Sequence, residues 1–163
     1  MEVRRIPMEQ LGPLLEEQLQ YGSARLPVTG SSMLPTLRQG RDVVRLVPVK
    51  YPPEKGAILL YRRENRQYVL HRLIRMENSE LCLCCGDNQW ERELVPFAQV
   101  IAVVDGLWRG GRWVDLKTDR KFLWNQRLWT NLYPVRRPMI AARRVVGRLR
   151  RIIKHHGGKL YED

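Results

Sequence analysis

The sequence contains no run of about 18 apolar residues, the length that a helix needs to cross a bilayer. Its first part also lacks the apolar core of a secretion signal and carries Glu2, Glu9, Glu16 and Glu17 instead. We therefore expect a cytoplasmic protein, which remains in the compartment where it is made.

Cysteine is scarce as well, and its spacing argues against two common uses. Cys82, Cys84 and Cys85 are the only cysteines, and they lie within a stretch of four residues. An odd number at this spacing suits neither a zinc site nor a disulfide that closes a loop. We predict reduced thiols on a β-strand, with no metal site and no cofactor.

Acidic side chains are few in the C-terminal part of the chain. Residues 1–114 carry 16 basic and 13 acidic side chains, whereas residues 115–163 carry 13 basic and 4 acidic ones. At 163 residues and 44% hydrophobic content, the chain can bury one core and carry an appendage. We predict a nearly neutral domain over residues 1–114 and, over residues 115–163, a basic tail that seeks an anionic partner.

The periodicity of this tail is helical. Over residues 139–154, apolar side chains share one helix face and basic side chains take the other. Residues 122–133 mix leucines and aromatic residues with neighbouring basic ones, which suits the boundary between lipid head groups and acyl chains. We expect residues 120–154 to bind an anionic membrane surface. The protein would then be a peripheral membrane protein on the inner face of the membrane. Packing of residues 122–133 on the domain is the alternative.

The sequence pattern before the tail predicts a short helix followed by a mainly β fold. Apolar residues recur at helical spacing over Ile6–Leu19, which predicts an amphipathic helix. After Pro35, short β-type runs alternate with turn residues, which indicates an antiparallel, barrel-like body. The predicted strands are Asp42–Val47, Ala57–Arg62, Gln67–Met76, Glu80–Cys85 and Val100–Trp108.

A pair of serines and one histidine are the candidates for chemistry. Ser31 and Ser32 precede a Met-Leu-Pro step, but a serine hydroxyl is a poor nucleophile until a base removes its proton. His71 is the candidate base, because strand alternation places its ring on one face with Val69 and Leu73. A histidine that only hydrogen-bonds within a sheet is the alternative.

Four motifs follow one another in a recognisable order. Gly30-Ser-Ser32-Met-Leu-Pro-Thr-Leu37 comes first, then Gly40 with Asp42-Val-Val44, then His71-Arg-Leu-Ile74, then Gly86-Asp-Asn88. Over about Val28 to Val104 this arrangement resembles the signal peptidase I family, in its histidine-type form and without the usual transmembrane anchor. The self-cleaving domains of SOS-type repressors share that fold. The resemblance implies a complex β barrel with a short N-terminal helix, to which this chain adds a basic C-terminal helical extension.

The resemblance also implies catalytic roles. Ser32 would be the nucleophile, and His71 the base that takes its proton and returns it to the leaving amine. Glu93 or Asp87 would orient the imidazole, while Asp87 has the organisation of its own turn as an alternative role. The backbone N–H of Ser32 would be the principal donor to the oxyanion.

The residues around the nucleophile are expected to form the substrate and oxyanion site. These are Gly30, Ser31, Met33 and Pro35. Gly30 stands where many signal peptidases carry a serine that assists the oxyanion hole, so here the hole would depend on backbone donors. Ser31 has a turn or helix-capping role as its alternative.

We therefore predict a serine endopeptidase with a Ser/His dyad or a Ser/His/acid triad. It would cleave a peptide or small protein, such as a leader peptide, bound as an extended strand. The alternative is a non-catalytic or self-cleaving repressor-like regulator whose basic tail binds nucleic acid or a partner. Only about 27 residues precede the serine motif, too few for a helix-turn-helix domain, so we do not expect nucleic acid as the partner.

Overall fold

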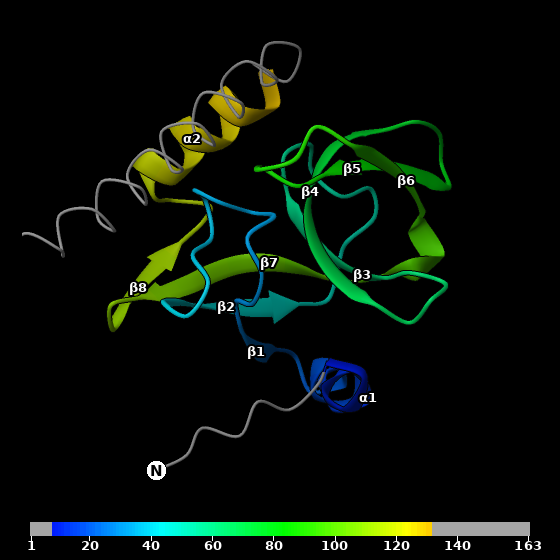
Figure 1. The fold of residues 1–163 in the computed structure, drawn as a ribbon, viewed down its shortest axis with the longest axis horizontal. Coiled ribbons are helices and arrows are strands. Elements are labelled where there is room, and N and C mark those ends of the chain that lie inside the picture. The colour runs from blue at the N-terminus through cyan, green and yellow to red at the C-terminus, as the bar shows by residue number, and fades with distance from the viewer. Residues whose placement is uncertain (1–7, 132–163) are drawn as a thin grey trace, which may run out of the picture. The chain divides into compact units, whose positions relative to one another are not determined.

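The structure is a computed structural model, and it describes residues 8–131 (Figure 1). The chain divides into two compact units after Thr130, and the sheet and pocket described below belong to the first. The elements are α1 (Met8–Gln20), β1 (Ala24–Pro27), β2 (Asp42–Val47), β3 (Ile58–Arg62), β4 (Tyr68–Met76), β5 (Leu81–Cys85), β6 (Arg92–Pro96), the short 3-10 helix η1 (Phe97–Gln99), β7 (Val100–Arg109), β8 (Arg112–Asp115) and α2 (Arg120–Asn131).

The predicted mainly β fold is confirmed. Eight antiparallel strands form one sheet in the order β1-β2-β7-β3-β4-β5-β6, with β8 paired to β7. Figure 1 shows the part of the sheet from β3 to β6 as strongly curved. Within residues 8–131 the sheet is not closed, because β1 and β6 are its two ends, so the predicted barrel is not confirmed.

The five predicted strands are all present, with bounds that differ by at most one residue. Three further strands, β1, β6 and β8, were not predicted. Each has only four or five residues, and β1 and β6 both end in proline, which is depleted in strands. Such short segments give little alternation, and pairing with longer neighbours accounts for their conformation.

Two buried clusters form the core. One joins α1, α2 and the strands β1, β2, β3 and β7, and it includes Leu15, Leu46 and Leu107. The other lies between β3, β4, β5 and β6, and it includes Tyr61 and Leu73. The three cysteines are buried thiols on β5, which is the strand placement predicted for them. Burial raises the pKa of the Cys82 and Cys84 thiols.

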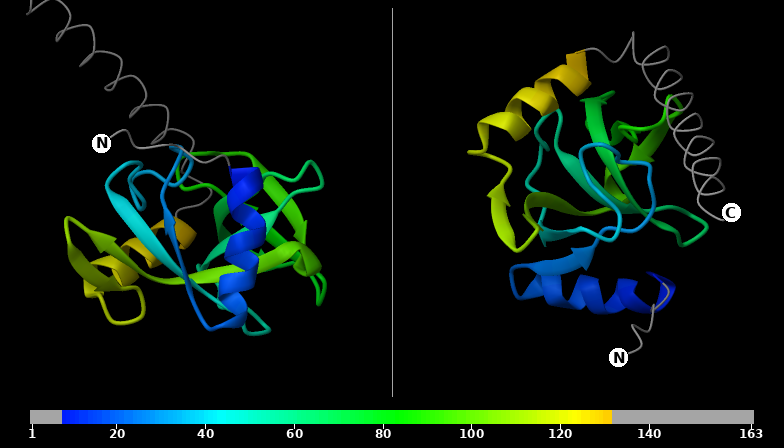
Figure 2. Two further views of the ribbon diagram at one scale, coloured as in Figure 1. Left: turned by 90° about the horizontal axis from the view of Figure 1, so that it is seen from below. Right: turned by 60° about the vertical axis from the view of Figure 1, so that its left-hand side comes forward.

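The helices α1 and α2, at the two ends of the described segment, both pack against the first of these clusters. α1 lies beside β1 (Figure 2) and buries Leu15 and Leu19, so the predicted N-terminal helix is confirmed over most of its length. On α2, Phe122 packs into the same cluster with Leu116, while Trp124 is 67% exposed. The start of the basic tail therefore packs on the domain, and the stretch 139–154 lies outside the described residues.

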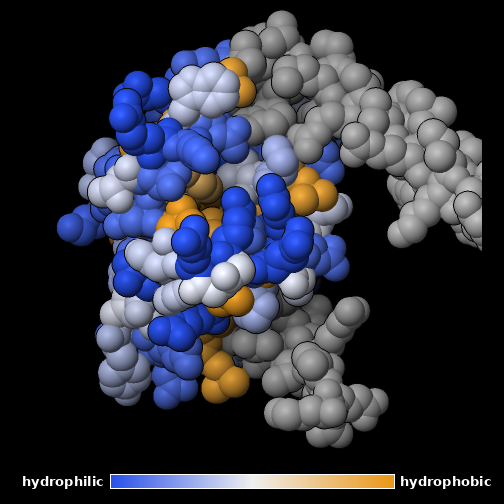
Figure 3. Space-filling model, turned by 90° about the vertical axis from the view of Figure 1, so that its left-hand side faces the viewer, coloured by the Kyte–Doolittle hydropathy of each residue, from blue (hydrophilic) through white to orange (hydrophobic). Residues whose placement is uncertain are grey.

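The face seen in Figure 3 is mostly hydrophilic, with separate small hydrophobic spots among the described residues. None of the helices that the structure describes is long and apolar enough to span a membrane.

Candidate active site

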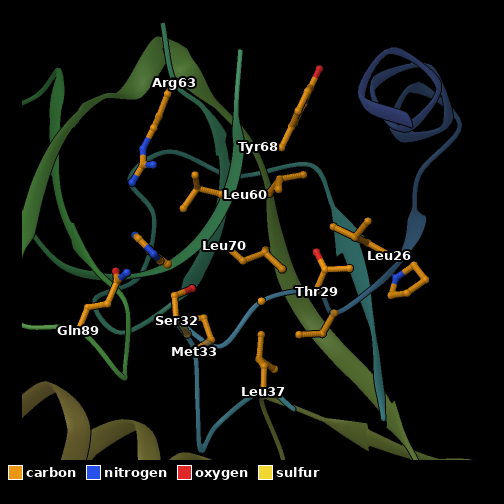
Figure 4. A pocket seen from close by; sticks show the side chains of 15 residues that line it. Leu26, Thr29, Ser32, Met33, Leu37, Leu60, Arg63, Tyr68, Leu70 and Gln89 are labelled. Atoms are coloured by element: carbon orange, nitrogen blue, oxygen red, sulfur yellow. The ribbon is translucent and has the colours of Figure 1, made fainter. Parts of the chain in front are cut away.

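Ser32 and His71 line one pocket of about 220 Å³ (Figure 4). Ser32 comes from the loop between β1 and β2, and His71 from β4. Figure 4 shows Arg63 and Gln89 extending to the side of the pocket where the Ser32 hydroxyl lies. Leu26 and Leu37 line another part of the wall. The two residues singled out from separate motifs are thus brought to one cavity.

The turn that carries Ser32 is clamped by the loop after β5. The N–H of Asn88 donates to the Ser32 carbonyl oxygen at 2.7 Å. The side-chain amide of Asn88 donates to the Ser31 carbonyl oxygen at 3.2 Å, and the N–H of Leu34 donates to that same oxygen. The Gly-Asp-Asn motif therefore fixes the backbone on either side of the candidate nucleophile.

The other predicted substrate and oxyanion residues divide into two groups. Gly30 and Met33 line the pocket, whereas Ser31 and Pro35 are not among the described residues that do so. Ser31 is exposed, and its carbonyl oxygen accepts a hydrogen bond from the Leu34 N–H within the turn. Gly30 has a φ of +78°, a left-handed conformation that would strain a serine at this position.

A buried ion pair forms the framework beneath this turn. Both Arg72 and Asp87 have fully buried side chains, and the Arg72 guanidinium donates to both Asp87 carboxylate oxygens at 2.8 and 2.7 Å. The Thr36 hydroxyl also donates to Asp87, and Arg72 donates to the Gly56 carbonyl at 2.7 Å. Asp87 thereby ties the serine loop to β4.

The hydrogen bonds of the His71 ring lead to Glu93 through a residue that the sequence analysis missed. The Nδ1 atom of His71 lies 2.9 Å from the Tyr61 hydroxyl. That hydroxyl donates to Glu93 at 2.8 Å, and Arg63 donates to both Glu93 oxygens at 2.8 and 2.7 Å. Glu93 therefore reaches the imidazole through Tyr61 rather than directly.

The position of Tyr61 follows from strand register. His71 on β4 is paired with Leu59 on β3, and Tyr61 lies two residues further along the same face. It is therefore the diagonal neighbour of His71 across the two strands. The Glu64-Asn65-Arg66 turn sets which residues of β3 and β4 are paired. This turn is therefore the sequence signal that could have placed Tyr61 beside His71.

The electrostatics of the site favour a neutral imidazole. Burial lowers the pKa of His71 to about 4, with the negative charge of Glu93 acting in the opposite direction. The hydrogen bonds from Arg63 lower the pKa of Glu93, which keeps its carboxylate ionised at neutral pH. Burial raises the pKa of Tyr61, so its hydroxyl keeps its proton. His71 is thus unprotonated at neutral pH and able to act as a base.

The serine loop and the imidazole meet at Gly86. A Cβ atom added to Gly86 would lie 2.8 Å from the Ser32 carbonyl oxygen and 3.1 Å from Nε2 of His71. It would also lie 2.8 Å from Oε1 of Gln89. Among the described residues the Ser32 hydroxyl makes no hydrogen bond to the imidazole, and such loose geometry is common in catalytic pairs before a substrate binds.

The residues from 8 to 131 contain no group of three His, Cys, Asp or Glu side chains placed to hold a metal ion. Comparisons of the chain with protein-family models, with curated proteins and with solved structures give no match. The resemblance carried by the four motifs therefore stays a prediction.

Proposed function

We propose that this chain is a serine endopeptidase of the signal peptidase type, with Ser32 as nucleophile and His71 as general base. One observation carries the proposal. Ser32 lines the same pocket as an imidazole that is neutral at neutral pH and bonded through Nδ1, which leaves Nε2 for proton transfer.

The proposed reaction uses the two groups in turn. The Ser32 oxygen attacks the carbonyl carbon of the substrate while Nε2 of His71 takes the hydroxyl proton. His71 then gives that proton to the departing amine, and the carbon–nitrogen bond breaks to leave an acyl-enzyme. Water, deprotonated by the same nitrogen, then attacks the ester carbonyl. The ester carbon–oxygen bond breaks as His71 returns the proton to the Ser32 oxygen, and the acid is released. The Ser32 N–H is the proposed principal oxyanion donor.

A free strand edge beside the pocket supports an extended substrate. Within the described sheet, β5 pairs with Arg72–Met76 of β4 and leaves one edge of Tyr68–Leu70 unpaired. Tyr68–Leu70 lines the pocket, and Val28–Gly30 lines it as well. We propose that the peptide adds to β4 as a strand, which would present its scissile carbonyl to Ser32.

The walls of the pocket favour apolar side chains next to the scissile bond. Leu26, Met33, Leu37, Leu60 and Leu70 all line it. A buried apolar wall favours a complementary apolar group because burial removes both from water. The proposed substrates are therefore peptides or small proteins, leader peptides included, with an apolar residue at the cleavage site.

The proposed place of action is the cytoplasm, with an anionic membrane surface as a partner of residues 120–154. The basic excess of the tail supports this part of the proposal. A sedimentation assay with anionic and neutral vesicles would test it, with duplex DNA as the competitor. Binding to anionic vesicles alone is expected, whereas tight binding to DNA without vesicle binding would favour a repressor-like regulator.

The catalytic part is tested by mass spectrometry of a peptide library incubated with the wild type and with Ser32→Ala. We expect cleavage by the wild type at apolar residues and none by the variant. Equal cleavage by the two proteins would mean that Ser32 is not the nucleophile.

A further inference from the structure

We propose that Tyr61 is a positioning residue that holds His71 in the tautomer with a proton on Nδ1 and a lone pair on Nε2. This inference rests on the proposed function only for its effect on catalysis. The tautomer itself follows from the contacts of three side chains, those of His71, Tyr61 and Glu93.

The number of protons available to these three side chains fixes the tautomer. The Tyr61 hydroxyl has one proton and lies between His71 Nδ1 at 2.9 Å and Glu93 Oε2 at 2.8 Å. The Glu93 carboxylate, gripped at both oxygens by Arg63, can only accept hydrogen bonds. The tyrosine proton therefore goes to Glu93, and the tyrosine oxygen has to accept a proton from Nδ1.

This assignment leaves the lone pair on the nitrogen that faces the serine loop. Nε2 is the ring atom close to Gly86, beside the Ser32 carbonyl oxygen. Because Tyr61 is fully buried in the core, its hydroxyl has little freedom to turn away. In the familiar Ser-His-Asp triad the carboxylate accepts the Nδ1 proton directly, whereas here a hydroxyl stands between the two groups.

The same arrangement stabilises the charge that appears during the reaction. When Nε2 takes the serine proton, the imidazole becomes a cation that still donates from Nδ1 to Tyr61. The Glu93 carboxylate behind Tyr61 attracts that charge, while Arg63 partly opposes it. Tyr61 thus transmits the effect of a carboxylate that does not itself touch the ring.

The test is an NMR measurement of the tautomer on the full chain labelled with ¹⁵N-histidine, compared between the wild type and Tyr61→Phe. His71 is assigned with His71→Asn. We expect the Nδ1–H form in the wild type and a shift toward the Nε2–H form in Tyr61→Phe. Since the wrong tautomer disables the base, kcat should fall at least about tenfold with little change in KM.

Tyr68→Phe is the matched control for the spectrum. It removes a hydroxyl that donates to the Glu16 carboxylate at 2.9 Å and does not contact the imidazole. We expect the His71 nitrogen shifts to stay as in the wild type. A similar shift in both variants would mean that the loss of a tyrosine hydroxyl disturbs the ring unspecifically, which would overturn the inference.

The outcomes separate this inference from the proposed function. A wild-type His71 in the Nε2–H form overturns it, and so does an unchanged tautomer in Tyr61→Phe. If the tautomer shifts in Tyr61→Phe but the wild type cleaves no peptide, the positioning role stands and the peptidase proposal fails. If Tyr61→Phe does not fold, the wild-type spectrum alone decides between the two tautomers.

Discussion

Replacing Gly86 by alanine should damage both catalysis and stability. The new methyl would lie 2.8 Å from the Ser32 carbonyl oxygen, which is 0.6 Å inside the 3.4 Å at which ordinary contact begins. That oxygen is backbone and is held by the Asn88 N–H at 2.7 Å, so it cannot move without loss of the bond. The methyl would also press on Nε2 of His71 at 3.1 Å. Both halves of the site have to shift.

The size of the effect follows from these distances. Overpacking of a buried position costs about 1–3 kcal/mol of stability. Since a misplacement of about 1 Å at a reacting group can cost about 100-fold in rate, a shift of roughly half that size should lower kcat about tenfold or more. The φ of Gly86 is not in the left-handed region, so the effect comes from lack of space.

The assay measures kcat on a cleaved peptide together with the free energy of unfolding in urea. Gly110→Ala is the matched control, because Gly110 has a φ of +57° with no atom within 4 Å of the new methyl, in the turn after β7. Backbone strain there should cost about 1 kcal/mol and leave kcat unchanged. If Gly86→Ala kept the kcat of the wild type, the serine loop and the imidazole would not be coupled through this contact.

The remaining predictions concern protonation, the buried ion pair and the thiols. Because the pKa of His71 is about 4, kcat/KM should rise through about pH 4 and stay level to neutral pH; a rise centred near 6.5 would contradict the buried base. His71 takes up its proton below about pH 6.5 in the unfolded chain and only near pH 4 in the folded one. The free energy of unfolding, measured by urea titration, should therefore fall by up to about 3 kcal/mol as the pH is lowered from 6.5 to 4, and by less in His71→Gln. Asp87→Asn leaves the buried Arg72 guanidinium without its countercharge and should lower the free energy of unfolding by about 3–5 kcal/mol; a loss below 1 kcal/mol would refute the framework role. The buried thiols of β5 should react with a disulfide reagent only on unfolding, and rapid reaction of the native protein would contradict their placement.

The parts of the fold that the sequence predicts are those with a long periodic signal. β4 and β7 have nine and ten residues, and their apolar and turn residues mark them clearly. β1, β6 and β8 are too short for such a signal, and their conformation depends on partners that lie far away in the sequence. The predicted barrel is not confirmed for a related reason, because no local sequence pattern indicates whether β1 and β6 pair.

The site divides in the same way. Ser32 and His71 could be named because motifs mark them, and the structure brings both to one pocket. Tyr61 could not, since its contact with His71 depends on the register of β3 and β4. Arg72 was missed as well, because a fully buried charge is visible only once Asp87 is placed beside it. Whether Asp87 or Glu93 serves the imidazole was likewise a question of packing, and Glu93 is the one joined to the ring, through Tyr61.

The most direct test is covalent labelling with a serine-reactive probe, with the modified residue identified by mass spectrometry. A peptidase that uses this pocket should carry the adduct on Ser32, with labelling lost in Ser32→Ala and strongly slowed in His71→Ala. Labelling of another residue, or equal labelling of His71→Ala and the wild type, would contradict the proposed pair of nucleophile and base.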